Sequence, residues 1–163
     1  MEGSHHLVPH PKAVSHLSTV YIHRSGKPII VVTRHYNGGP GGFQVEDESP
    51  TVIDNPSDPL ALGTVILDAL KATTARPARN YRDRKLTDWP AFRSSGARSV
   101  RRFEEEFIRL QIHGANAANA TYIIEGWPKK DAKLRVTTAV NISPGAIGTE
   151  CLEVWRACLH RAV

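Results

Sequence analysis

Histidine, cysteine and carboxylate side chains are the groups with which this chain could hold a metal ion. Four of the eight histidines fall within the first 17 residues, and no His-x-x-x-His or Cys-x-x-Cys pair occurs. The other four are widely separated along the chain: His23, His35, His113 and His160. Because a metal site needs several ligands that converge on one point, the sequence predicts neither a metal site nor a bound cofactor.

Residues that could act as nucleophiles or as acid–base catalysts lack the partners that such chemistry needs. No serine stands in a Gly-x-Ser-x-Gly turn, and the glycine-rich segment 37–42 lacks the Lys-Ser/Thr ending of a phosphate-binding loop. Cys151 and Cys158 lie two turns apart on one predicted helical face, too far for a disulfide, so we expect two buried thiols. The consecutive carboxylates 104–106 scatter around a helix. We therefore expect a binding protein with no catalytic residues, and not an enzyme.

The positive charge of the chain is concentrated in its middle. The net charge is +5, and residues 73–109 hold ten Lys/Arg against five Asp/Glu, whereas residues 1–72 hold five against seven. The arginines of the middle segment are interleaved with Tyr81, Trp89 and Phe92, whose rings could stack on bases. An RNA- or DNA-binding module that uses this segment is therefore one functional hypothesis, although no recognised nucleic-acid motif is present.

Local patterns predict strands and helices in an order that occurs twice. The first half should contain a hairpin at 18–34, short strands at 43–45 and 51–53, and a helix that Ser57 or Asp58 caps. The second half should contain strands at 107–112, 121–125 and 134–140, and a helix from 143 to about 160. In between, we expect a helical turn at 87–92 and a short helix capped by Ser99, with Trp89, Phe92, Val100 and Phe103 facing the core.

The two predicted helices share a local signature. Leu62-Gly63-Thr64 is matched by Ile147-Gly148-Thr149, 85 residues later. Glycine early in a helix costs up to about 1 kcal/mol against alanine, so we expect each glycine to let its helix lie close on a sheet. The predicted fold class is α+β: a duplicated unit of antiparallel strands followed by a helix, with a short helical connector between the copies. A single domain should span 18–163, with repeats at about 18–72 and 106–163 and the connector at about 73–105.

No apolar run approaches the roughly 18 residues of a membrane span, and the N-terminus lacks the pattern of a secretory signal. We therefore expect a soluble, cytoplasmic protein that does not contact a membrane. Residues 1–17 are expected to be disordered or partly derived from an expression tag.

This order of features resembles the immunity proteins of contact-dependent growth inhibition systems, the CdiI family. The resemblance covers roughly residues 18–160. Five segments carry it: the hairpin at 20–33, the helix segment 60–70, the turn Asp88-Trp89-Pro90-Ala91-Phe92, the segment 99–103, and the helix that contains Ile147-Gly148-Thr149.

The resemblance implies an immunity protein that binds and neutralises the C-terminal toxin domain of a cognate contact-dependent growth inhibition protein. The partner would be that toxin domain, held in a heterodimer. Many such toxins are nucleases, often tRNases, so nucleic acid would be met only through the toxin. The family has no universal binding motif, so no residue carries over as a binding residue.

Charge suggests two sets of toxin-binding residues. A nuclease is usually basic, so the acidic triplet Glu46, Asp47 and Glu48 could enter a basic cleft from its glycine-flanked loop. Alternatively, connector arginines, among them Arg79, Arg82 and Arg84, could pair with the carboxylates of a metal-dependent nuclease site. We slightly favour the triplet, because a mobile tip beside a strand can reach into a groove.

Overall fold

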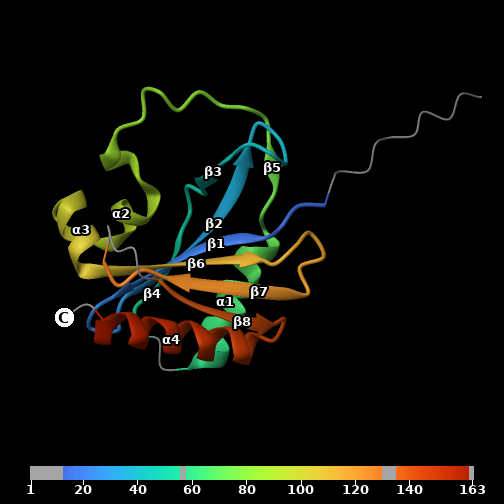
Figure 1. Ribbon diagram of the computed structural model, residues 1–163. Coiled ribbons are helices and arrows are strands. Elements are labelled where there is room, and N and C mark those ends of the chain that lie inside the picture. The colour runs from blue at the N-terminus through green and yellow to red at the C-terminus, as the bar shows by residue number, and fades with distance from the viewer. Residues whose placement is uncertain (1–12, 56–57, 130–134, 162–163) are drawn as a thin grey trace, which may run out of the picture.

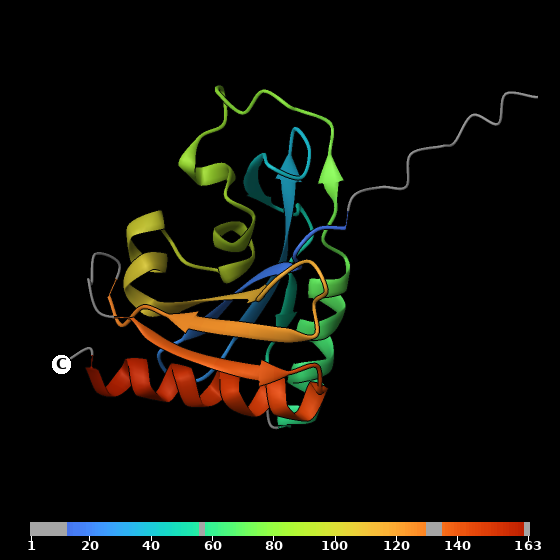
Figure 2. The same ribbon diagram turned by 45° about the vertical axis from the view of Figure 1, so that its right-hand side comes forward.

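The fold is built on one mixed β-sheet. The computed structural model describes residues 13–55, 58–129 and 135–161. The strands of the sheet lie in the order β3-β2-β1-β6-β7-β8, and all these neighbours are antiparallel. Two short strands pair separately with β2: β4 antiparallel and β5 parallel. The helices α1 and α4 lie on one side of the sheet, and the connector that holds α2 and α3 arches over the other side (Figures 1 and 2).

The bounds of the elements follow the sequence prediction closely. The first half contains β1 (Leu17–His23), β2 (Ile29–Asn37), β3 (Phe43–Glu46), β4 (Thr51–Ile53) and α1 (Pro59–Lys71). The connector contains β5 (Ala75–Arg76), a 3-10 turn (Leu86–Asp88), α2 (Pro90–Ser95) and α3 (Val100–Glu106). The second half contains β6 (Phe107–Gly114), β7 (Thr121–Gly126), β8 (Val136–Asn141) and α4 (Pro144–Arg161). The α+β class is confirmed.

Strand β1 is buried on both faces, which explains its nearly continuous run of β-branched and aromatic residues. Val20 and Ile22 face the core beneath α1 and α4, whereas Tyr21 faces the connector. The turn to β2 passes through Gly26, whose φ of 97° favours glycine. The central hairpin therefore joins two separate apolar clusters, one on each side of the sheet.

The two helices cross at their glycines. A Cβ on Gly63 would lie 1.6 Å from the carbonyl oxygen of Pro144 in α4, and a Cβ on Gly148 would lie 1.8 Å from that of Pro59 in α1. The expectation that these glycines bring each helix close to the sheet is therefore wrong, because each glycine faces the start of the other helix. The contacts are reciprocal, as expected of equivalent positions in two copies of a repeat.

The starts of helices α1 and α3 follow local signals in the sequence. The Asp58 side chain caps α1 by accepting from the backbone N–H of Leu60 at 2.9 Å, whereas Ser57, the other predicted cap, lies outside the described residues. The Ser99 side chain caps α3 by accepting from the N–H of Arg102 at 3.2 Å. Of residues 1–17, only 13–17 are described, and Leu17 already pairs with His113 in the sheet.

The connector packs on the sheet through aromatic side chains. Trp89, Phe92 and Phe103 form an apolar cluster with sheet residues that include Tyr21 and Phe107, as the sequence predicts. Phe103 is 1% exposed, and its ring centroid lies 4.9 Å from that of Trp89 and 5.1 Å from that of Tyr21. Val100, the fourth predicted contact, is half-buried and lies outside this cluster.

The two cysteines are free and buried on α4, as predicted. Burial raises the pKa of the Cys151 thiol to about 12 and that of Cys158 to about 11, so both stay protonated and act as small apolar side chains. Within the described part of the chain, no helix has the length and apolar character required to cross a membrane.

The glycine crossing predicts that Gly148→Ala lowers the free energy of unfolding by at least about 2 kcal/mol, because the added methyl collides with the backbone of α1. Urea denaturation measures the change. Gly145→Ala, in the first turn of the same helix, is the matched control, since its Cβ would meet only Leu60 Cδ1 at 4.0 Å. An equal loss of stability in both variants would contradict the proposed helix contact.

Candidate functional site

The acidic triplet lies where β3 ends, beneath the connector, and each of its carboxylates already has partners. Glu46 is the last residue of β3 and accepts hydrogen bonds from the Tyr21 hydroxyl, from Trp89 Nε1 at 2.9 Å and from the Ala91 N–H at 3.4 Å. Burial and the neighbouring Glu46 carboxylate raise the pKa of Tyr21 well above its ordinary value, so the phenol remains a donor. Glu46 therefore ties the connector to the sheet.

Asp47 joins β2 to the start of the connector. Its carboxylate accepts from His35 Nε2 and from Arg76 Nη2, both at 2.9 Å. His35 is 2% exposed, and its Nδ1 accepts from the Thr74 N–H at 3.1 Å, which places the ring proton on Nε2. Partial burial of Asp47 favours a higher pKa, but the hydrogen bonds from His35, from the Ser49 N–H and from Arg76, together with the Arg76 charge, outweigh it and hold the pKa below its usual value.

Glu48 brings the two predicted sets of binding residues together. Its carboxylate lies 2.5 Å from Arg84 Nη2, and the Arg84 guanidinium stacks over the Tyr81 ring at 5.3 Å. Arg79 and Arg82 stand on the same arch, exposed, and neither pairs with an acid within the described ranges. The structure therefore places the acidic triplet and the arginines on one surface of mixed charge. Within the triplet, Glu46 points inward to the connector and does not belong to a mobile tip.

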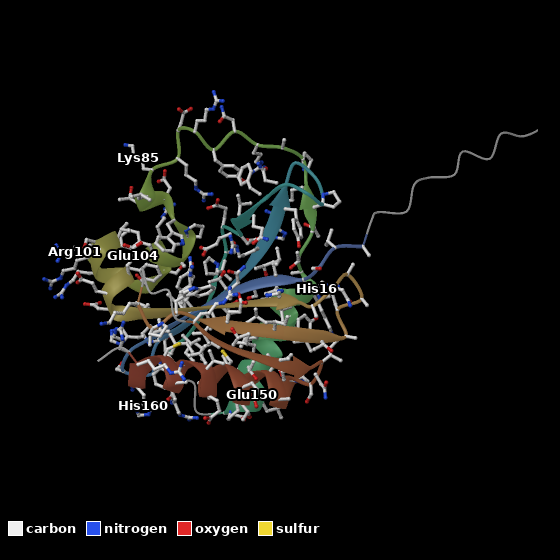
Figure 3. The ribbon with its side chains drawn as sticks, viewed as in Figure 1. His16, Lys85, Arg101, Glu104, Glu150 and His160 are labelled. Carbon is white, nitrogen blue, oxygen red and sulfur yellow. The ribbon has the colours of Figure 1, made fainter. Side chains whose placement is uncertain are left out.

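A hollow of about 430 Å³ separates the arch of the connector from the sheet, and we name it the connector pocket. Strands β1, β2 and β6 supply its floor, β3 borders it from Phe43 to Glu46, and the arch supplies its wall. The floor contains Thr19 of β1, Arg34 of β2 and Arg109 of β6; the wall contains Tyr81, Arg84, Lys85, Leu86 and Trp89. Lys85 stands on the outer bend of the arch, on the opposite side of the molecule from Glu150 and His160 of α4 (Figure 3).

The floor carries polar groups that the described residues leave without hydrogen bonds. Thr19 is 2% exposed, yet neither its Oγ1 nor Arg34 Nε has a partner in the described part of the chain. Burial lowers the pKa of Arg34, because a guanidinium in this position is poorly hydrated. At the rim, Phe43 is 60% exposed and Leu86 is 75% exposed. The pocket therefore combines a cationic floor with an apolar rim.

A second, smaller hollow of about 240 Å³ lies on the other side of Tyr21 and Trp89. Arg109 borders both hollows, and its guanidinium stacks over the Trp127 ring at 4.7 Å. Across residues 13–55, 58–129 and 135–161, no group of three or more His, Cys, Asp or Glu side chains is placed to hold a metal ion.

Sequence reasoning did not find Thr19, Arg34 or Arg109 as site residues. Each interrupts a strand that is otherwise rich in apolar residues, and strand periodicity places each on the face away from α1 and α4. This alternation is the signal that could have identified them, but their convergence depends on the order of the strands in the sheet.

The tie through Glu46 predicts that Glu46→Ala lowers the free energy of unfolding by at least about 2 kcal/mol, because the buried Tyr21 hydroxyl and the Trp89 N–H lose their acceptor. Hydrogen exchange should also quicken across 86–95. Glu48→Ala, in the same triplet, removes only a 61% exposed carboxylate and should cost under about 1 kcal/mol. Equal losses in both variants would show that Glu46 does not hold the connector.

Comparison of the sequence with protein families finds no match, and comparison with curated proteins finds none. Among the solved structures that match are two whose likeness extends over most of the chain. A Neisseria meningitidis protein of unknown function, NMB0488, aligns with a TM-score of 0.64 and 14% identity over 93% of this chain and 98% of the other. A chain of the CdiA-CT/CdiI toxin and immunity complex from Yersinia pseudotuberculosis aligns with a TM-score of 0.58 and 15% identity over 88% of this chain and 97% of the other. At this identity the similarity concerns the fold.

Proposed function

We propose that this chain is an immunity protein that binds and neutralises the C-terminal toxin domain of a cognate contact-dependent growth inhibition protein. The observation that carries the proposal is the likeness to a chain of the Yersinia pseudotuberculosis toxin and immunity complex, which extends over 97% of that chain. Because nearly the whole fold is shared, the likeness does not depend on one common motif. The resemblance of the sequence to the CdiI family supports the same role.

The connector face suits a protein partner. We use this name for the arch and the adjoining strand β3, with Phe43, Glu48, Arg79, Arg82, Arg84 and Leu86 as its outward side chains. Exposed Phe43 and Leu86 stand beside both signs of charge, a combination typical of interfaces between separately folded proteins. A standard interface would bury about 800 Å² on each partner.

On this surface the six predicted binding residues have different roles. Glu48, Arg79, Arg82 and Arg84 would face the toxin. Glu46 and Asp47 would support the surface, since their carboxylates are engaged with Tyr21, Trp89, His35 and Arg76. We propose that the protein acts through this contact alone, by covering the toxin's active site or the path of its substrate, without covalent chemistry of its own.

We further propose that the toxin is a nuclease, with a tRNase as one form. This class follows from the family resemblance and fits a surface that offers both acids and arginines. Direct binding of RNA or DNA by the connector is the weaker alternative. Four of its arginines are already paired with acids: Arg76 with Asp47, Arg84 with Glu48, Arg101 with Glu105 and Arg102 with Glu106. Such pairs reduce the field that would attract phosphates.

The proposal predicts that this protein co-purifies with the toxin domain encoded beside it and restores growth to cells that express that domain. Arg82→Glu should weaken the complex at least about tenfold, because it reverses an exposed charge on the connector face. Arg156→Glu is the matched control, since Arg156 is exposed on α4, on the far side of the sheet. Titration calorimetry measures both affinities. Absence of a complex with the unchanged protein would contradict the proposed function.

A further inference from the structure

The Thr19 hydroxyl is the most informative group of the connector pocket. It is 2% exposed and has no hydrogen-bond partner in the described part of the chain, although a buried hydroxyl without a partner is destabilising. The next residue, Ser18, faces the other side of β1, where its hydroxyl donates to the Val32 carbonyl at 3.0 Å. Two adjacent buried hydroxyls therefore differ in one respect: only the one in the pocket is unpaired.

Two arginines flank Thr19 on the strands beside it. Thr19 stands opposite Val32 of β2 and Gln111 of β6, so Arg34 and Arg109 are its diagonal neighbours on the same face. Diagonal positions lie about 7–8 Å apart, which long side chains can span. Arg34 Nε is a second buried donor without a partner among the described residues. A hydroxyl and a guanidinium N–H are thus available to one acceptor group.

The charged groups that line the pocket leave it with a net positive charge. Arg34 and Arg109 contribute two positive charges, and Glu46, which stands opposite Arg34 in β3, contributes one negative charge. The oxygens of Glu46 are engaged with Tyr21, Trp89 and Ala91. Arg84 in the wall is neutralised by Glu48, whereas Lys85 in the same wall has no acid partner among the described residues and adds a further positive charge. The pocket therefore suits an anionic group.

We propose that the connector pocket holds one carboxylate, the side chain of an Asp or Glu on an exposed segment of the toxin domain, with Thr19 Oγ1 and Arg34 as its donors and Arg109 beside it. This inference rests on the proposed function and names the group that the pocket recognises. The exposed apolar rim of Phe43 and Leu86 favours a protein segment over a free phosphate, and Asp and Glu are the side chains through which such a segment offers an anionic group.

The test compares three variants of the full chain for binding to the toxin domain encoded beside it. Thr19→Val keeps the shape of the side chain and removes only the unpaired hydroxyl. It should leave the stability of the free protein unchanged or higher and weaken the complex at least about tenfold. Arg34→Lys keeps the charge, removes the planar donor group, and should weaken the complex similarly. Ser18→Ala is the matched control: it should lower stability and leave the affinity unchanged.

Alanine substitution of each exposed Asp and Glu of the toxin domain identifies the carboxylate. One such variant should bind at least about tenfold more weakly, and Thr19→Val should have no further effect on it. If the unchanged proteins form a complex but Thr19→Val and Arg34→Lys bind as tightly, the carboxylate site is disproved and the proposed function stands. If no complex forms, both are disproved. Competition by millimolar orthophosphate or AMP that depends on Thr19 would overturn the carboxylate assignment.

Discussion

The contact between α1 and α4 at Gly63 and Gly148 is the constraint on which the arrangement of the two halves depends. Either glycine, given a side chain, would place its Cβ within 1.8 Å of a carbonyl oxygen of the other helix. Helical glycine is unfavourable by up to about 1 kcal/mol, so two glycines at equivalent positions are explained by the packing that they allow. Strands of both halves then share one apolar cluster beneath the helix pair.

Because both long helices lie on one side of the sheet, the other side depends on the connector for cover. The connector covers only part of it. Its aromatic side chains pack around Phe103, and the Glu46 carboxylate binds Trp89 at the border of this packed region. Beyond that border the arch stands away from Thr19, Arg34 and Arg109, and the connector pocket remains. The asymmetry of the helix layer thus produces the hollow that we assign to a partner.

Local signals in the sequence were sufficient to predict most of the helices and strands. They could not predict which strands pair over long distances along the chain. Caps such as Asp58 and Ser99 and the alternation within strands act over a few residues, so they can be read directly. The parallel pairing of β5 with β2 was missed, because two residues carry no periodicity and the pairing involves distant positions. Strand β2 also extends to Asn37, beyond the end of the hairpin predicted at 18–34, where it pairs with both β3 and β5.

The sequence predicted which charged residues belong to the candidate site, but not which of them pair with one another. The charge pattern singled out both the acidic triplet and the arginines, yet the pairs Asp47–Arg76 and Glu48–Arg84 join positions 29 and 36 residues apart. No local rule joins such positions. The unpaired groups of the pocket were harder still to find, because a threonine within a buried strand is ordinary until its hydroxyl is seen to lack a partner.

Net charge is a poor guide to what the connector face could bind, and the ion pairs explain why. The chain carries +5, which at first conflicts with the proposed inhibition of a basic nuclease. However, Asp47 and Glu48 of the first half form ion pairs with Arg76 and Arg84 of the connector, so part of the positive charge of the middle segment is neutralised within the protein. Positive charges that no acid neutralises within the described residues remain at defined places: Arg79, Arg82 and Lys85 on the arch, Arg93 and Arg98 farther along the connector, and the positive charge of the pocket floor. A surface of this kind selects a partner by the position of its carboxylates, and it can therefore bind a protein whose net charge has the same sign as its own.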